Sequence, residues 1–536
     1  MSNRRMLFAT ALLLTGAVPL VACNSLTGID DLVIGNSAGA GGATGAGGAG
    51  VSGPAATTGE GPGAVTSGEV AASSSTGEPL PTLVAAQGVT ISQIAIYQAV
   101  KRVLMLDGSA PSSKVPVVAA RPALIRVFAK ADGTYDGSPV TARLDLGNGA
   151  PIELQVTVKD TPSDAVLGST INFDVPAALV APGMKYRVDL LQPPAHSMGN
   201  NPAASYPASG TSPIPAASSG KSLKIELIPV SYGADGSNRK PDTSAGQLQA
   251  YKDAFFRMYP VADVELLMHA DYPWDGNVDP NGNGWGELLD GIANLRQKDN
   301  APSDVYYYGI FSPSSSVNQY CGGGCVAGLG MIGGPADSYA RAAIGLGFTG
   351  DIATETAVHE LGHTHGRQHS PCGGAQGTDP GYPYQGASIG VWGYDLIDKK
   401  LLSPSDFTDV MGYCQPIWVS DFTYKALFDR VKTVNNASIF YAPELLDRTY
   451  QRARIDGEGN LTWMTDTLIH TPPMGQPQTI TVQSDLGDSA VEAQLYPYDH
   501  LPGGVLVWPQ PLGATKAITM QRAGKVTTLS RASAAW

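Results

Sequence analysis

The chain is poor in charged residues, and poorest in basic ones. Its 536 residues include 34 Lys and Arg against 47 Asp and Glu, so the formal net charge is −13 and the pI is near 5.0. Nucleic acids are bound through clustered positive charge, and this balance therefore argues against a nucleic-acid partner. An excess of negative charge fits an exported soluble domain but does not identify what that domain acts on.

Long apolar runs are also scarce, and the one at the N-terminus predicts export. Arg4 and Arg5 precede an apolar stretch that reaches Leu20, and small residues lie before a cleavage point. This order is typical of a secretory signal peptide over residues 1–22. An uncleaved membrane anchor is the alternative, but the run is near the lower length limit for a spanning helix.

The end of this run, Leu20-Val21-Ala22-Cys23, resembles a bacterial lipobox. The resemblance implies that Cys23 becomes the lipidated first residue of the mature chain. Several acyl chains on one residue are enough for stable anchoring. We therefore expect an exported bacterial lipoprotein at the outer membrane or cell surface, attached to the membrane through its lipid alone.

Composition divides much of the remaining chain. Residues 23–81 are rich in Gly, Ala, Ser and Thr and are expected to form a disordered tether, because they cannot bury enough apolar surface to fold. Residues 82–191 contain short β-branched runs between Gly, Pro and Asp turns, which predict an immunoglobulin-like β-sandwich. Residues 192–220, rich in Pro, Ala and Ser, are expected to be a linker. Residues 442–536 are again strand-like and predict a small β domain.

Residues 221–441 show a different pattern, in which strand-like and helical segments alternate. The runs LKIELIPVSY, VELLMH and DVYYYGIF read as strands, and helices are expected over Ser244–Tyr259 and Glu287–Lys298. Such alternation predicts a mixed α/β domain. The stretch Val326–Gly334 could hold an edge strand along which an extended substrate pairs.

A single short segment of this domain carries the chemistry. It contains H-E-x-x-H-x-x-G-x-x-H, with His359, Glu360, His363, Gly366 and His369 at the fixed positions. Histidines four apart lie on one face of a helix, and a glycine at positive φ turns the chain so that a third histidine can return. Three protein ligands with an open fourth position are typical of catalytic zinc. The sequence therefore predicts one catalytic Zn²⁺.

Two further residues of the segment have different expected roles. Glu360 is placed to act as general base towards a water whose pKa the metal lowers to ~7. His365 fits none of the ligand positions, and we interpret it as a residue that ends the helix or supports a metal ligand without binding the metal itself.

This long motif, followed by Asp409-Val410-Met411-Gly412-Tyr413-Cys414, resembles that of the metzincin zinc endopeptidases. The resemblance implies a metzincin-like catalytic domain with Met411 in a turn beneath the metal and Tyr413 as a catalytic residue that binds the metal or stabilises the oxyanion. A core methionine is the alternative for Met411. Among metzincins, the sequence most resembles the StcE-like, ToxR-regulated-lipoprotein type. These are bacterial enzymes that cut extracellular glycoproteins.

The expected function is that of a monomeric, lipid-anchored zinc endopeptidase acting on extracellular proteins or glycoproteins. The flanking β domains would serve as spacers or exosites, and no cysteine-switch propeptide is evident. The alternative is a surface binding protein or adhesin that keeps the protease fold for recognition. Intact Glu360 favours the enzyme, because a binding protein has no chemical need for that carboxylate.

Only five cysteines are present, and their number fits export. With Cys23 lipidated, an even set of four remains, which an exported chain should oxidise. We predict a small Cys321–Cys325 loop and a Cys372–Cys414 bridge from the zinc motif to the methionine turn. A thiolate zinc site is the alternative, disfavoured because three histidines already serve the metal.

A second metal motif is weaker. Asp275, Asn277 and Asp279 have the spacing of an EF-hand calcium loop, but Pro280 replaces its glycine and Glu287 lies one position too far. The alternative to Ca²⁺ is an Asn-Gly turn cluster, which we favour.

Overall fold

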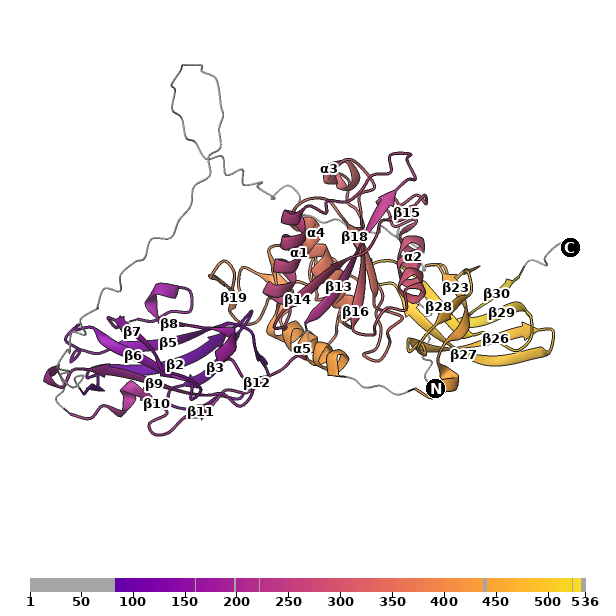
Figure 1. The fold of residues 1–536 in the computed structure, drawn as a ribbon. Coiled ribbons are helices and arrows are strands. Elements are labelled where there is room, and N and C mark those ends of the chain that lie inside the picture. Colours follow the sequence, from indigo (N-terminus) through magenta and orange to yellow (C-terminus); the bar gives the residue numbers. More distant parts are fainter. Residues whose placement is uncertain are drawn as a thin grey trace, which may run out of the picture.

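In the computed structural model, the described residues are 82–531 except 160, 197–198, 221, 437–440 and 523. The predicted signal peptide, the lipidation site Cys23 and the tether of residues 23–81 lie outside this described part. Within the described ranges, no helix is both long and apolar enough to cross a membrane. The described chain forms three successive parts that lie side by side (Figure 1).

The first part consists of two antiparallel sheets around one core. One sheet has the strand order β3-β2-β5-β8 and the other β1-β9-β6-β7. Inward-facing side chains from both sheets, including Ile94, Ile125 and Val188, are fully buried together, as alternating strands require. The strands are β1 (Val84–Ala85), β2 (Val89–Tyr97), β3 (Lys101–Leu106), β5 (Ala123–Ala131), β6 (Val140–Asp145), β7 (Ile152–Val156), β8 (Ile171–Val175) and β9 (Lys185–Gln192).

The segment 192–220, expected as a linker, instead adds strands to this part. β10 (Ser205–Tyr206) and β11 (Ser212–Pro213) pair with β9, and β12 (Ala216–Ala217) pairs in parallel with β4 (Val117–Val118). Strands of two residues have no apolar periodicity that could reveal them in a sequence. They are held by hydrogen bonds to strands that already exist.

The second part contains a sheet of order β14-β13-β16-β18-β17, in which the first four strands are parallel and β17 is antiparallel. Parallel neighbours need crossover connections, which the helices supply. The two expected helices are present as α1 and α2. The elements are β13 (Leu223–Tyr232), α1 (Ala245–Met258), β14 (Val264–Met268), β15 (Tyr272–Trp274), α2 (Trp285–Lys298), β16 (Val305–Phe311), α3 (Val317–Cys321), β17 (Gly328–Gly330), β18 (Ala342–Leu346), α4 (Asp351–Thr364), β19 (Gly393–Asp395), β20 (Lys400–Leu402), β21 (Thr408–Asp409), β22 (Ile417–Trp418) and α5 (Asp421–Asn436).

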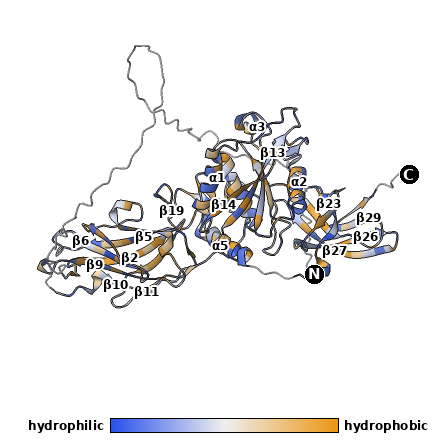
Figure 2. Cartoon of the chain, viewed as in Figure 1, coloured by the Kyte–Doolittle hydropathy of each residue, from blue (hydrophilic) through white to orange (hydrophobic). Residues whose placement is uncertain are grey.

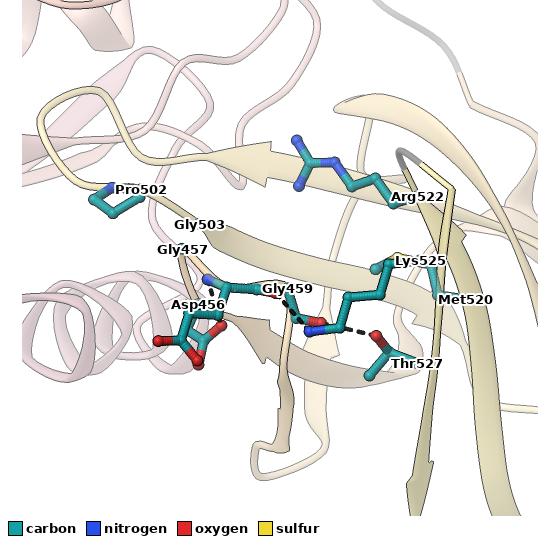
Figure 3. A pocket seen from close by; sticks show the side chains of 10 residues that line it. Asp456, Gly457, Gly459, Pro502, Gly503, Met520, Arg522, Lys525 and Thr527 are labelled. Atoms are coloured by element: carbon teal, nitrogen blue, oxygen red, sulfur yellow. Dashed lines mark hydrogen bonds between the residues drawn. The ribbon is translucent and has the colours of Figure 1, made fainter. Parts of the chain in front are cut away.

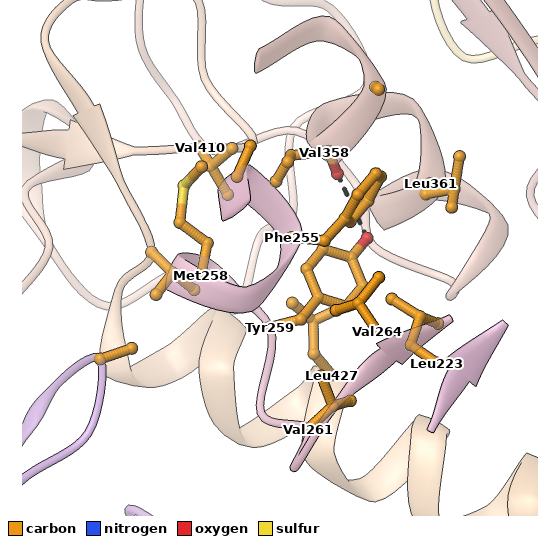
Figure 4. Packing of buried hydrophobic residues seen from close by; sticks show 14 of the residues in the cluster. Leu223, Phe255, Met258, Tyr259, Val261, Val264, Val358, Leu361, Val410 and Leu427 are labelled. Atoms are coloured by element: carbon orange, nitrogen blue, oxygen red, sulfur yellow. Dashed lines mark hydrogen bonds between the residues drawn. The ribbon is translucent and has the colours of Figure 1, made fainter. Parts of the chain in front are cut away.

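At the centre of this sheet both faces are buried: every residue of β16 and β18 is buried, and these strands are mainly apolar (Figure 2). On one face Leu223 of β13 packs in a cluster with Phe255 of α1 and Val358 of α4 (Figure 4). On the other face Ile228 packs with Leu289 of α2. Because α4 follows the buried strand β18 and packs against α1, the core fixes the position of that helix.

The third part is a sheet of order β24-β23-β28-β27-β26-β29-β30, with β25 paired to β23. Tyr496, Val505 and Val507 on one face join the core of the second part. The fully buried Arg452 of β23 forms an ion pair with Asp290 of α2. The strands are β23 (Arg448–Ile455), β24 (Leu461–Trp463), β25 (Thr467–Ile469), β26 (Gln476–Ser484), β27 (Gly487–Pro497), β28 (Gly504–Pro509), β29 (Thr515–Arg522) and β30 (Lys525–Ser530).

Arg121 joins the first part to the second. Its guanidinium is fully buried and donates hydrogen bonds to the backbone carbonyls of Phe256, Tyr259 and Val261, at 2.5, 3.0 and 2.8 Å. These carbonyls lie at and just beyond the C-terminus of α1, where the last helical carbonyls lack partners within the helix. A cation there also interacts favourably with the helix dipole.

Replacing Arg121 by Ala should therefore destabilise the protein. Several buried carbonyls would lose their donor, and we expect the free energy of unfolding to fall by about 3 kcal/mol. Urea unfolding followed by circular dichroism measures the change. The control is Arg143→Ala, which removes an exposed ion pair with Glu153 and should cost less than about 1 kcal/mol. Equal effects of the two substitutions would contradict this role.

Candidate metal centre

The histidine motif lies on α4 and on the turn that ends it. Asp351 stands in the first helical turn, where a negative charge is favourable. At the other end Gly366 has φ +80°, its N–H bonds to the carbonyl of His363, and the N–H of Arg367 bonds to that of Gly362. This pair of hydrogen bonds is a Schellman motif, which requires the positive φ that glycine adopts freely. The chain is thereby turned so that His369 returns to the helix.

The three predicted ligand histidines come together with a geometry that fits a metal ion. The Nδ1 atom of each ring faces a backbone carbonyl, which fixes the orientation of the ring. His359 Nδ1 lies 2.7 Å from the carbonyl of Val410, and His363 Nδ1 lies 2.7 Å from that of Arg367. His369 Nδ1 is 2.5 Å from the carbonyl of Gln376. Such contacts set the tautomer and leave each Nε2 free to bind a metal.

The free nitrogens are spaced as zinc requires. The Nε2 atoms of His359 and His363 are 3.0 Å apart, which is close to the separation of roughly 3.3 Å between two ligands of a tetrahedral zinc. Burial lowers the pKa of all three imidazoles, to about 4 for His363 and about 2 for His369. The rings are therefore neutral at physiological pH, which is the form that binds a metal.

Glu360 belongs to α4, and its carboxylate lies against the edge strand β17. Burial raises the pKa of its carboxyl well above the ordinary value, and the nearby Asp499 adds to the effect. Its Oε2 atom is buried and has no hydrogen-bond partner among the described residues. A Cβ added at Gly328 of β17 would lie 2.3 Å from Glu360 Oε1, so the absence of a side chain there makes room for the carboxylate.

Residues 409–414, here called the methionine segment, pack against the helix that carries the motif. Met411 is buried, and a Cβ added at Gly362 of α4 would be 2.4 Å from its sulfur atom. The carboxylate of Asp409 holds the turn by accepting hydrogen bonds from the N–H groups of Met411 and Ser420, both at 2.9 Å. The Tyr413 hydroxyl lies 3.1 Å from His369 Nε2, at the metal-binding edge of the ring.

Both predicted disulfides are confirmed. Cys321 is bonded to Cys325, and Cys372 to Cys414. The second bridge joins Cys372, three residues after the last motif histidine, to Cys414 at the end of the methionine segment. It is reinforced by a 2.9 Å hydrogen bond from the N–H of Ser370 to the carbonyl of Met411.

Two other sequence candidates lie away from this centre. His365 points into the core, stacked on Tyr306 at 4.2 Å between ring centroids, with its Nδ1 2.7 Å from the carbonyl of Leu361. In the EF-hand-like segment, Asp279 accepts hydrogen bonds from the backbone of Asn281 and Asn283, which favours the Asn-Gly turn. The remaining EF-hand-like positions are also committed elsewhere: the Asn277 side chain lies 3.5 Å from the Tyr232 hydroxyl, Asp275 lies against Gly233, and Glu287 pairs with Arg454.

The centre also contains two residues that the sequence did not reveal, Asp499 and His500 of the third part. A nitrogen of His500 lies with one from each motif histidine in a group whose atoms are all within 4.8 Å of one another. Asp499 Oδ2 is 3.2 Å from His363 Nε2. Asp499 and His500 follow the motif by more than 100 residues, and no spacing rule connects them to it. The only hint was that His500 is an unassigned histidine beside a Pro-Gly-Gly turn.

A match to a protein family supports a metal centre at these residues. Residues 327–416 match the family model described as Peptidase M66, a range that includes β17, α4, His369 and Met411. No curated protein matches the chain. Among solved structures, it is similar to metalloproteinase-II from Bacteroides fragilis, with 14% identity over 60% of this chain and 86% of that one, and a TM-score of 0.24. The family match and the buried histidine cluster together support a metallopeptidase.

The bridge between the motif and the methionine segment should matter more for stability than the small loop. Cys372 and Cys414 are 42 residues apart and Cys321 and Cys325 only 4, so removal should cost about 4 and about 2 kcal/mol respectively on chain-entropy grounds. The paired Cys→Ala variants can be compared by chemical unfolding. A larger loss from the Cys321/Cys325 pair would refute this ranking.

Proposed function

We propose that the protein is a zinc-dependent endopeptidase in which Glu360 is the general base. The observation that carries the proposal is the convergence of three buried, neutral histidines beside a buried carboxylate. Bound zinc would supply a Lewis acid that lowers the pKa of water towards ~7 and polarises a scissile carbonyl. His359, His363 and His369 would hold it.

The remaining groups of the centre have roles that follow from their positions. Glu360 takes a proton from the attacking water and passes it to the departing amine, and a raised pKa suits a group that must both accept and release that proton. The Tyr413 hydroxyl, whose pKa burial raises, stays protonated and can donate a hydrogen bond to the oxyanion. β17 supplies an edge along which an extended peptide can pair.

The wider proposal is that of a metzincin of the StcE-like type. A methionine beneath the motif helix and a tyrosine at the metal edge support it. We further propose that the first part is immunoglobulin-like, and that lipid on Cys23 holds the protein at the outer membrane or cell surface. There it would act on extracellular proteins or glycoproteins. The excess of negative charge and the two disulfides agree with export.

Glu360→Gln tests the assignment of the base. The amide has nearly the same shape but accepts no proton, so we expect zinc to remain near one per chain while peptide cleavage falls at least ~10³-fold. Both quantities are measured on residues 24–536, by metal analysis and by cleavage of a diverse peptide library with and without chelator. The metal-free control is His359→Ala, which should lose zinc. Undiminished cleavage by Glu360→Gln, or no zinc in the parent, would sink the proposal.

Gly328→Ala tests the fit between Glu360 and the edge strand. The added methyl would occupy the place of the carboxylate, so cleavage should fall by roughly ten- to a hundredfold while zinc content stays unchanged. Gly334→Ala is the matched control, because the nearest atom to its Cβ, a backbone oxygen, is 3.8 Å away. A loss of zinc in Gly328→Ala would show instead that the helix itself had moved.

A further inference from the structure

The connection between β27 and β28 reaches into the metal centre. It leaves the third part after Pro497 and returns at Gly504, and Asp499 and His500 stand at its inner end. The Asp499 side chain is 0% exposed and that of His500 is 10% exposed. Its outer residues Pro502 and Gly503 line a surface hollow together with Lys525 (Figure 3). The connection therefore runs from the surface to the metal ligands.

His500 is placed as a fourth nitrogen ligand. Its group within 4.8 Å includes all three motif histidines, whereas Asp499 is grouped with Glu360 and His363 but not with His359 or His369. Asp499 Oδ2 lies 2.9 Å from His500 Nδ1, without hydrogen-bond alignment. Both atoms are buried and lack hydrogen-bond partners among the described residues, and a bound metal ion would satisfy such a cluster of polar atoms.

The same connection occupies the edge where a substrate would pair. Tyr498 forms an antiparallel bridge with Met331, which directly follows β17. The N–H of Gly330 donates a 3.1 Å hydrogen bond to Asp499 Oδ1. An extended substrate would need these backbone groups and the space next to Glu360.

The connection is held by packing on both sides. A Cβ at Gly286 of α2 would lie 2.6 Å from the Tyr498 hydroxyl, and one at Gly282 would lie 2.4 Å from Leu501 Cδ2. Gly503, at φ +105°, closes the loop by accepting a 3.2 Å hydrogen bond from the N–H of Tyr498. Because Gly282 and Gly286 have no side chains, the side chains of the connection can pack closely against the backbone at these two positions.

We propose that His500 is a fourth metal ligand and that the Asp499-His500 pair keeps the enzyme latent. This inference rests on the proposed zinc peptidase function and concerns its regulation. With His500 bound, the position needed by water is filled, and Asp499 occupies the space beside Glu360. Cleavage then requires the 498–503 connection to withdraw from the centre.

The first test counts ligands in the unaltered protein. X-ray absorption of zinc-loaded residues 24–536 should show four imidazole nitrogens, and His500→Ala should show three nitrogens and one oxygen. The rate at which zinc is lost to a competing chelator should be at least ~10-fold higher in His500→Ala than in the parent. His196→Ala, at an exposed site of the first part, is the control and should resemble the parent. Three imidazoles and an oxygen in the parent would overturn the assignment.

The second test is cleavage of the peptide library. His500→Ala, and Asp499→Ala as a second opening variant, should cleave at least ~10-fold faster than the parent, and Glu360→Gln in the His500→Ala background should abolish the gain. Slower cleavage by His500→Ala with zinc retained would overturn latency and make His500 an aid to the reaction. A change from four to three imidazoles without cleavage in any variant would support the ligand assignment and overturn the peptidase function itself.

Discussion

The metal centre depends on three imidazole rings whose orientations are fixed, so that their Nε2 atoms point to one place. Each ring of the motif is held at Nδ1 by a backbone carbonyl, and those carbonyls belong to three different segments: Val410 before the methionine, Arg367 in the helix-ending turn and Gln376 beyond it. A metal site of this kind tolerates little displacement, because both the distance and the direction of every lone pair matter. The methionine segment, the Gly366 turn and the Cys372–Cys414 bridge all serve to hold these carbonyls in place.

The surrounding fold meets the same requirement at a larger scale. α4 packs on the sheet through its own apolar residues, and α1 packs beside it on the same face. Arg121 of the first part satisfies the end of α1, and Arg452 of the third part is paired with Asp290 on α2. Neither contact touches the metal centre. They fix the helices on the two faces of the sheet and so limit how far α4 and β17 can shift.

What could be predicted from the sequence was what depends on local spacing. The offsets among His359, His363 and His369 imply one helix face and one turn. The two cysteine pairs were predicted from the even set of four that remains after Cys23 in a chain expected to be exported. The strands of residues 205–217 could not be foreseen, because their order comes from a neighbouring sheet and not from their own pattern. His500 could not be foreseen either, because its approach to α4 is set by how two separate sheets pack.

Access to the centre is limited by the connection that carries Asp499 and His500, and the way it is fastened indicates what has to move. The third part is fixed by the buried Arg452–Asp290 pair and by a 2.5 Å hydrogen bond from the Tyr496 hydroxyl to the buried Asp337. Separating buried charged partners costs several kcal/mol, since each would be left unpaired in an apolar setting. The inner end of the connection is held by the Gly330–Asp499 hydrogen bond, the Met331–Tyr498 bridge, the Asp499–His363 contact and, once metal is bound, the proposed His500 ligand bond. Withdrawal of residues 498–503 alone would break these contacts but leave the Arg452–Asp290 and Tyr496–Asp337 pairs intact, so the third part can stay docked while substrate reaches β17.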